Sequence, residues 1–225
     1  MDILYMLTLR QNKNGGNIMP KGSPELTAAR KEEIINACEQ LYQTMSFKEI
    51  TLKEIGNVTS FTRTSIYNYF QTKEEIFLAL FQREYDRWNE DLTNILKENE
   101  QLTKKELAEL ISHSLAGRQQ LLKLLSMNIF DMEANSRQEL LTAFKHSYGR
   151  SMQLISMVLQ KFCPEMTVSD IQNFIYIFFP FMFGIYPYTE VTEKQRAAMK
   201  EAGINYVYQS AYELIYSCLR RLLGA

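Results

Sequence analysis

Residues 62–70 combine side chains that can bind phosphate and read bases. Their sequence, TRTSIYNYF, supplies hydroxyl, guanidinium, phenol and amide groups. These are the groups that contact the phosphate oxygens and the base edges of DNA. Ile66, Phe70 and one side of Tyr67 are apolar, which is enough to seat a short helix on a neighbour. The remaining side chains must therefore face something polar, and their chemistry fits nucleic acid.

Two helix-start signals flank this segment. Thr51 is followed three residues later by Glu54, and Thr72 is followed by Glu75. A hydroxyl and a carboxylate at this spacing predict a capping box, in which each side chain bonds to a free backbone N–H group. We therefore expect two short helices separated by a tight corner, followed by a third and longer helix that begins at Thr72.

The charge balance limits how this segment could hold nucleic acid. The chain of 225 residues has a net charge of −1, which argues against binding by bulk positive charge. Acidic residues slightly outnumber basic ones between residues 20 and 75. Residues 56–73, however, contain Arg63 and Lys73 and no acidic residue. DNA binding would therefore depend on a local patch, which dimerisation would double.

The other reactive side chains form no catalytic or metal-binding motif. The sequence has no HExxH, no Gly-rich phosphate loop and no GxSxG elbow. Glu106, Glu109 and His113 share nearby helical turns, but a single copy is weak support for a carboxylate–histidine site. The three cysteines are widely spaced without a CxxC pair, as in a cytosolic protein with reduced thiols. We expect no catalytic residue, no metal and no cofactor.

The elements that position residues 62–70 are predicted to be helices. Ser23 and Pro24 start a helix whose apolar stripe ends near Met45. Its stripe and the apolar residues of the two short helices would form a three-helix core, the usual support of a helix-turn-helix reader. From Thr72 the helical spacing continues to Leu96, which predicts a long helix that enters a second domain.

The rest of the chain is also predicted to be helical. Residues 121–130 are nearly all apolar and should be buried, and further helix starts stand at Thr103, Ser136, Thr167 and Thr192. The last helix should reach Leu223, with an interruption near Gly203. We expect an all-α fold with a flexible extension over residues 1–19, a helix-turn-helix domain over 20–72 and a larger helical bundle over 73–225.

Residues 171–189 carry no charge and raise the alternative of a membrane span. Their dense apolar part is shorter than the ~20 residues that a span needs. Pro180, Gly184 and Pro187 also interrupt it. We expect a core helix kinked at Pro180 and no membrane association.

Residues 51–80 resemble the DNA-binding signature of the TetR/AcrR family of bacterial transcriptional regulators. The positions that match the family pattern are Thr51, Ile55, Ile66, Tyr67, Tyr69, Phe70, Lys73 and Ile76. Three positions depart from it: Ser60 replaces a glycine at the corner, Gly56 replaces an alanine between the two helices, and Thr64 replaces a glycine in the reader. Ser60 must make the turn without the conformational freedom of glycine.

The resemblance implies a role for each matching polar residue. Thr51, Tyr67 and Lys73 correspond to phosphate contacts of the family. The residues that correspond to its groove-facing set are Thr62, Arg63, Ser65, Asn68 and Tyr69. Among these, Arg63 is the candidate for bidentate binding to guanine. The alternative for each is a solvated surface side chain or, for Tyr67, a core aromatic.

The resemblance also implies that the C-terminal bundle binds a ligand and dimerises. Tyr208, Ala211, Ile215, Cys218 and Leu222 form a seam on the last helix, which suits either a homodimer through the last two helices or an intrachain core. An apolar or cationic ligand could bind among aromatic and methionine side chains, which could equally be core. This candidate pocket consists of Trp88, Met127, Phe130, Met152, Phe178, Met182 and Tyr186.

Together these features predict a cytoplasmic, homodimeric repressor that binds a double-stranded DNA operator and is released by a small-molecule effector. The alternative is a helical enzyme or a protein-interaction adaptor without DNA binding, whose small helical domain merely packs. A shared exposed face for Arg63, Asn68 and Tyr69 is what the regulator hypothesis requires.

Overall fold

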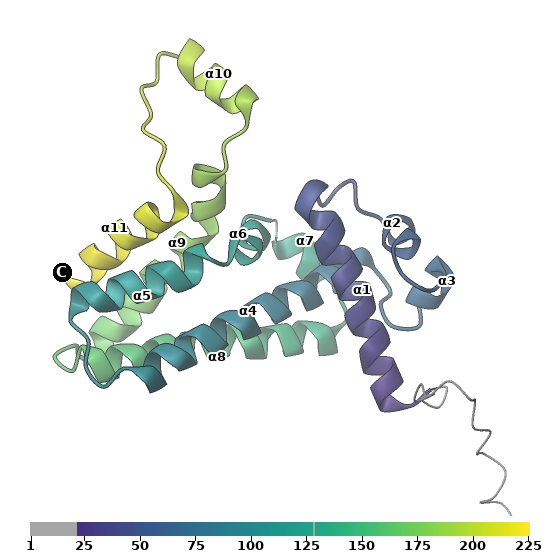
Figure 1. Cartoon of the computed structure of the whole chain (residues 1–225), viewed down its shortest axis with the longest axis horizontal. Coiled ribbons are helices and arrows are strands. Elements are labelled where there is room, and N and C mark those ends of the chain that lie inside the picture. Colours follow the sequence, from purple (N-terminus) through teal and green to yellow (C-terminus); the bar gives the residue numbers. More distant parts are fainter. Residues whose placement is uncertain (1–21, 128) are drawn as a thin grey trace, which may run out of the picture.

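The computed structural model describes residues 22–127 and 129–225, so the predicted extension over residues 1–19 lies outside the described part. Within that part the chain is helical without strands, as predicted (Figure 1). In chain order the helices are α1 (Pro24–Thr44), α2 (Leu52–Asn57), α3 (Arg63–Ile66), α4 (Lys73–Glu98), α5 (Lys104–Ala116), α6 (Gln119–Leu125), α7 (Ile129–Ala134), α8 (Gln138–Phe162), α9 (Val168–Thr189), α10 (Glu193–Glu201) and α11 (Ala211–Leu223).

Helices α1, α2 and α3 form the predicted small core together with the start of α4 (Figure 1). Ile34, Ile55 and Ile66 are fully buried in it. The ring of Phe77 on α4 makes edge-to-face contacts with two aromatic rings, and its centroid lies 5.1 Å from that of Tyr42 and 4.8 Å from that of Phe47. These contacts anchor α4 in the small domain, so that the helix belongs to both domains.

The larger domain is built on α4 and α8, which run parallel along their length (Figure 1). Their direction follows from the bonds that join them. The Asn89 side chain donates to the carbonyl oxygen of Ser147 at 3.0 Å, and the Lys161 ammonium donates to that of Leu96 at 2.7 Å. Helices α5, α6, α9 and α11 pack on this pair and on each other, and the core lies between them.

Helix α9 passes through the core with one side and faces outward with the other. Phe178 and Met182 are fully buried, whereas Tyr176 is 69% and Ile177 52% exposed. By length and composition α9 is apolar enough to cross a membrane, and it is the one described helix of this kind. Its packing on α6, α8 and α11 is that of a core helix, as we predicted, and the helix runs unbroken through Pro180.

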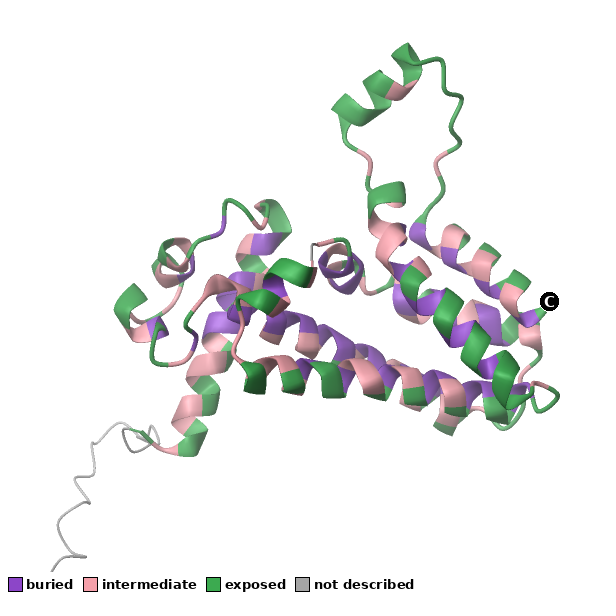
Figure 2. Cartoon of the chain, turned by 180° about the vertical axis from the view of Figure 1, so that it is seen from behind, coloured by how far each residue is buried: buried purple, intermediate pink, exposed green. Residues whose placement is uncertain are grey.

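The end of the chain differs from the single interrupted helix that we predicted. Gly203 adopts φ +70° and ends α10, and residues 204–210 then run without helical structure to α11. Ser210 and Glu213 form a complete capping box that starts α11. Tyr208 therefore lies outside the predicted seam. Helix α10 and the coil segments on either side of it project from the body (Figure 2), and no residue of α10 is buried.

Candidate nucleic-acid interface

Helix α2 begins at Thr51, whose hydroxyl oxygen accepts from the backbone N–H groups of Lys53 at 3.2 Å and Glu54 at 3.4 Å. The Glu54 carboxylate accepts from the Thr51 hydroxyl and not from the backbone, so half of the predicted capping box forms. The second box is also incomplete. The Thr72 hydroxyl accepts from Glu75 N–H at 3.2 Å, but the Glu75 carboxylate accepts from Gln71 N–H at 2.7 Å.

The corner between α2 and α3 is held by side chains instead of by a glycine. The Thr59 hydroxyl lies 3.1 Å from the carbonyl oxygen of Gly56 and 3.0 Å from that of Phe61. The backbone N–H of Ser60 donates to the Glu33 carboxylate on α1. Every described residue with positive φ is a glycine, so Ser60 makes the turn without left-handed backbone. The departure from the family pattern therefore costs no backbone strain here.

Gly56 allows α2 and α3 to approach closely. A Cβ atom added there would lie 3.2 Å from the backbone nitrogen of Arg63 and 3.3 Å from its Cα. Those distances are shorter than ordinary van der Waals contacts between carbon atoms. The position of Arg63 relative to the domain is therefore set in part by the missing side chain at residue 56.

Helix α3 is a single turn that continues as tighter turns to Phe70. Tyr69 N–H donates to Ile66 O at 2.8 Å and Asn68 N–H to Ser65 O at 3.2 Å. Ile66 and Phe70 are buried, as predicted, and fix this segment on the core. Because the segment is so short, its orientation depends on those two side chains and on the contacts at its two ends.

The polar residues of this segment separate into an exposed group and a supporting group. Thr62, Arg63, Tyr67 and Asn68 are exposed. The Arg63 guanidinium donates to the Tyr67 hydroxyl at 3.1 Å, which pre-orients both side chains at the surface. Ser65 and Tyr69 are half-buried: the Ser65 hydroxyl lies 3.3 Å from that of Thr62, and the Tyr69 ring packs 6.2 Å from that of Phe61.

Two basic residues have roles that the sequence did not indicate. The Lys73 ammonium donates to the carbonyl oxygens of Phe47 at 2.7 Å and Ile50 at 3.1 Å, so two of its three N–H groups already hold the chain between α1 and α2. Arg30 on α1 places its guanidinium 4.9 Å from the Phe61 ring, beside the corner. No sequence pattern marks Arg30, because the fold alone brings α1 to this surface.

Comparison with protein families identifies both domains. Residues 34–80 match the profile described as "Bacterial regulatory proteins, tetR family", and residues 82–209 match "Tetracyclin repressor-like, C-terminal domain". The chain belongs to the TetR family. It is therefore a DNA-binding transcriptional regulator and not an enzyme, which removes the alternative of a helical enzyme or adaptor. Among curated proteins, none matches this chain.

Solved structures of other regulators share this fold. A TetR-family regulator from Streptomyces coelicolor aligns with a TM-score of 0.57 and 16% identity, over 87% of this chain and 98% of that one. The fatty acid degradation regulator FadR of Bacillus halodurans gives 0.56 and 16%, over 91% and 97%. Thermus thermophilus FadR, solved with lauroyl-CoA, gives 0.56 and 19%, over 86% and 93%.

The residues that we predicted to line an effector pocket are dispersed in this TetR regulator. Trp88, Phe178 and Met182 are fully buried core residues. Phe130 on α7 is 78% exposed, contrary to the burial expected for residues 121–130, and so encloses no interior cavity. The others, which are half-buried at the edge of the core, are Met127, Met152 and Tyr186.

An aromatic cavity of about 100 Å³ lies elsewhere, between α4, α7, α8 and α9. Its lining consists of Phe81, Tyr85, Ile129, Glu133, Phe144, Lys145, Tyr148 and Phe183. Glu133 and Lys145 form an ion pair of 2.5 Å among these rings. We call this space the aromatic cavity; none of the seven predicted pocket residues is among its lining residues.

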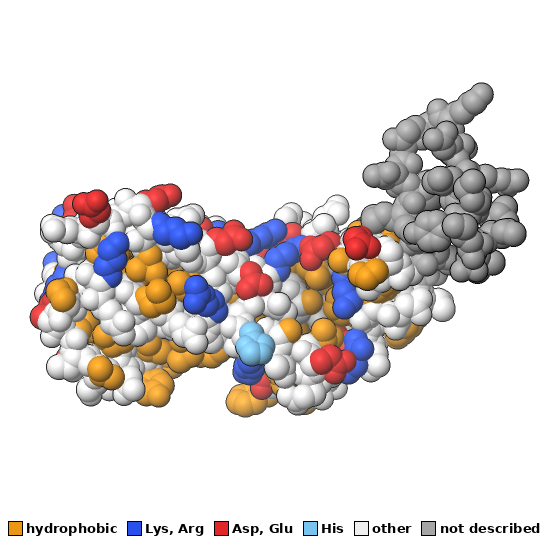
Figure 3. Space-filling view, turned by 90° about the horizontal axis from the view of Figure 1, so that it is seen from below, with side chains coloured by type: hydrophobic (Ala, Val, Ile, Leu, Met, Phe, Trp, Pro, Cys, Tyr) orange, Lys and Arg blue, Asp and Glu red, His pale blue; other side chains and the backbone are white. Residues whose placement is uncertain are grey.

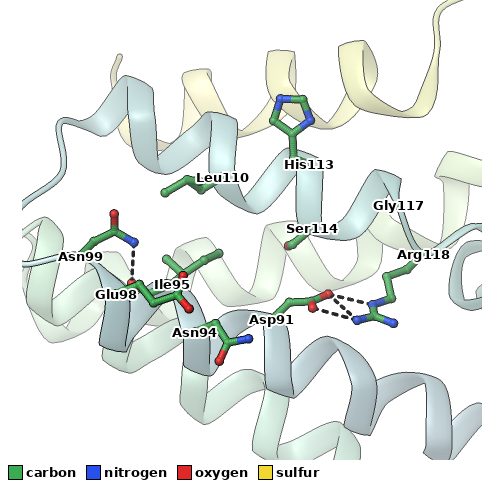
Figure 4. A pocket seen from close by; sticks show the side chains of 10 residues that line it. All are labelled: Asp91, Asn94, Ile95, Glu98, Asn99, Leu110, His113, Ser114, Gly117 and Arg118. Carbon is green, nitrogen blue, oxygen red and sulfur yellow. Dashed lines mark hydrogen bonds and ion pairs between the residues drawn. The ribbon is translucent and has the colours of Figure 1, made fainter.

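A wider groove of about 560 Å³ runs between α4 and α5 (Figure 4). Two of its charged groups are already paired, since the Arg118 guanidinium donates twice to the Asp91 carboxylate at 2.8 Å. His113 points away from the groove and stacks on Tyr212 of α11, with centroids 4.3 Å apart. Among the described residues no group of three or more His, Cys, Asp or Glu side chains could hold a metal ion.

Proposed function

We propose that this TetR regulator represses transcription by placing α3 and the turns after it in the major groove of its operator. We call these residues, 62–70, the reader segment. The observation that supports this most directly is the exposed group of Thr62, Arg63, Tyr67 and Asn68 on a segment anchored by buried residues. Arg63 would read guanine, and Tyr67 and the capped start of α2 at Thr51 would contact phosphates. Ser65 and Tyr69 would support these contacts from the half-buried side.

Lys73 would contribute to DNA binding mainly by holding the chain between α1 and α2. Its remaining N–H group could still reach a phosphate. The face shown in Figure 3 offers no basic surface that would add to this binding, because lysine, arginine, aspartate and glutamate side chains are interspersed on it. Affinity would therefore rest on the local patch and on its duplication in a dimer.

We also propose a homodimer formed through α9 and α11. The outward face of α9 carries Tyr176, Ile177 and Pro180, and an added Cβ at Gly184 would meet no atom within 4 Å. Such an apolar strip on a soluble regulator suits a two-fold interface with a second copy. Two reader segments would then be held about one helical turn, roughly 34 Å, apart on DNA.

The proposed dimer is tested by Ile177→Glu, which should shift the mass measured by light scattering from dimer to monomer. Met157→Glu is the comparison, because Met157 is similarly exposed but belongs to α8 and to neither proposed interface helix. An unchanged mass for Ile177→Glu would place the interface elsewhere.

The effector is proposed to be a small molecule whose apolar part enters the aromatic cavity and whose charged group replaces one partner of the Glu133–Lys145 pair. A cavity of about 150 Å³ can bind benzene, so about 100 Å³ suits a small group unless the core opens. The T. thermophilus and Bacillus subtilis FadR structures contain lauroyl-CoA and stearoyl-CoA, which makes lauroyl-CoA a reasonable first probe. Release of bound DNA by the probe, abolished in Lys145→Ala, would support this site.

DNA recognition is tested by a mobility-shift assay with the DNA upstream of the regulator's own gene. Wild-type protein should bind it specifically and with strong salt dependence, and Arg63→Ala should lose about 1–3 kcal/mol of specific binding free energy. Arg150→Ala, which removes an exposed arginine from α8, is the control. Equal binding by Arg63→Ala and wild type would reject the proposed reader.

A further inference from the structure

The short loop between α7 and α8 bonds directly to the end of the reader segment. The Arg137 guanidinium donates to the carbonyl oxygen of Tyr69 at 3.0 Å. The Thr72 hydroxyl donates to the carbonyl oxygen of Asn135 at 2.9 Å. Tyr69 closes the turns after α3, and Thr72 caps α4. A loop of the larger domain therefore holds the reader segment at the point where it leaves the DNA-binding surface.

Glu75 is the centre of this connection. Its carboxylate is 1% exposed and receives four hydrogen bonds. Arg137 gives three of them: from Nε at 2.7 Å, from Nη2 at 2.9 Å and from its backbone N–H at 3.1 Å. Gln71 N–H gives the fourth, at 2.7 Å. A bidentate pair of this kind fixes both partners in direction as well as in distance.

The charge of Glu75 is maintained although it is buried. Burial acts to raise the pKa of the Glu75 carboxyl, but the hydrogen bonds from Arg137 and Gln71 outweigh it and hold the pKa below its ordinary value. The carboxylate is therefore ionised at neutral pH, and the bonds to Gln71 and Arg137 are made together. We call Glu75, Arg137, Tyr69 O and Gln71 N–H the interdomain clamp.

The same loop leads from the aromatic cavity. Ile129 and Glu133 of α7 line that cavity, and α7 ends at Ala134, directly before Asn135. Asn135 is itself tied to α7, because its side chain donates to Asp131 O at 2.8 Å. Only three residues therefore separate the end of α7 from the start of α8, and the last of them is Arg137 of the clamp. A shift of α7 would move Asn135 and Arg137 with it.

We propose that Arg137 is a positioning residue that couples the aromatic cavity to the DNA-reading segment. This inference rests on the proposed function. With the cavity empty, the clamp fixes Tyr69 and Gln71, and through them the exposed group that includes Arg63. A molecule that enters the cavity displaces Glu133 and α7, draws Arg137 away from Tyr69 O and Glu75, and leaves the reader segment free to reorient. Such release lowers specific binding because only one reader orientation matches the groove.

The test compares full-length wild type with Arg137→Ala, Arg137→Lys and the control Arg150→Ala. Arg137→Lys retains a positive charge for Glu75 but lacks the forked guanidinium that also reaches Tyr69 O. This variant replaces Arg137→Ala in the comparison if Arg137→Ala does not fold. Fluorescence anisotropy measures affinity for the operator and for a scrambled duplex at one salt concentration. Hydrogen exchange measures protection of the amides of Tyr69 and Gln71, and light scattering measures the oligomeric state.

In both Arg137 variants the ratio of operator affinity to scrambled-duplex affinity should fall, by about tenfold in Arg137→Ala and less in Arg137→Lys. Exchange at Tyr69 and Gln71 should accelerate while the α8 amides and the mass stay unchanged. A purely structural role would lower both affinities equally and leave their ratio unchanged. A folded Arg137→Lys protein with the wild-type ratio and wild-type exchange would overturn the coupling role. A wild type that does not distinguish operator from scrambled DNA would instead overturn the proposed function itself, and with it the coupling.

Discussion

Replacing Gly56 with alanine should separate the stability of the DNA-binding domain from its affinity for DNA. Alanine is favoured over glycine in a helix interior by about 1 kcal/mol, which would stabilise α2. The new Cβ, however, would lie 3.2 Å from Arg63 N and 3.3 Å from Arg63 Cα. These atoms belong to backbone and cannot rotate away, so the start of α3 must move by a few tenths of an ångström.

The two effects oppose each other in the free energy of unfolding. The strain of moving α3 should offset most of the helix-propensity gain, so we expect a net change within about 1 kcal/mol. Affinity should respond more strongly, because Arg63 sits at the displaced residue and a bidentate contact to guanine is worth about 1–3 kcal/mol. Losing part of that contact corresponds to a threefold to tenfold weaker operator complex, by about 0.7–1.4 kcal/mol.

Urea unfolding and operator titration of the same Gly56→Ala preparation measure the two quantities. Asn57→Ala is a useful comparison, since Asn57 is exposed at the end of the same helix. A Gly56→Ala protein that gains the full helix-propensity stabilisation and binds the operator like wild type would refute the close approach of α2 and α3. The result would mean that Arg63 is not positioned by residue 56.

Three further predictions concern packing, ionisation and thiol reactivity. Ile66→Ala should lower the free energy of unfolding by about 2–4 kcal/mol in urea titrations, because Ile66 is fully buried on the inner side of the reader segment. The depressed pKa of Glu75 contributes stability that is present above the pKa of an unfolded carboxyl and is lost as the pH falls through the folded value; Glu75→Gln should lack this part of the acid-induced loss in thermal melts. Burial raises the pKa of the Cys38, Cys163 and Cys218 thiols, so a disulfide reagent at neutral pH should label them slowly until the protein is unfolded.

The reader segment shows how much of the candidate site could be predicted from local sequence. The alternation of polar groups with Ile66 and Phe70 predicted one buried and one exposed side, and the structure confirms both. The regulator hypothesis also required that Arg63, Asn68 and Tyr69 share one exposed face. Arg63 and Asn68 meet this requirement, whereas Tyr69 is half-buried against Phe61. Spacing could not reveal this, because Phe61 reaches Tyr69 through the fold of the corner.

The proposed effector site was the least predictable part of the molecule. Aromatic and methionine residues at helical spacing are expected both in a core and in a pocket, and periodicity does not distinguish them. The structure places Trp88 and Met182 in the core, with the aromatic cavity beside them. Whether a small space remains between side chains depends on how four helices pack, which no single helix encodes.

At the C-terminal end of the chain, too, local signals predicted only part of the structure. From the sequence we predicted that Gly203 would interrupt the last helix, and the structure confirms a helix end there. We did not predict the capping box of Ser210 and Glu213 that starts α11, nor the projection of α10 and its flanking coil from the body (Figure 2). Local signals state where a helix can begin or end. The path between them depends on whether the body offers a surface on which to fold back.

By itself, the sequence determined the all-helical class, most helix starts and the position of the helix-turn-helix, because capping, spacing and side-chain chemistry act within a few residues. Only the tertiary structure decided what those residues do together. It directs Lys73 to the carbonyl groups of Phe47 and Ile50, and it joins Glu75 to Arg137 across 62 positions of the chain. An arginine and a glutamate so far apart carry no mark of their pairing, since the pair exists only where α4 and α8 run side by side.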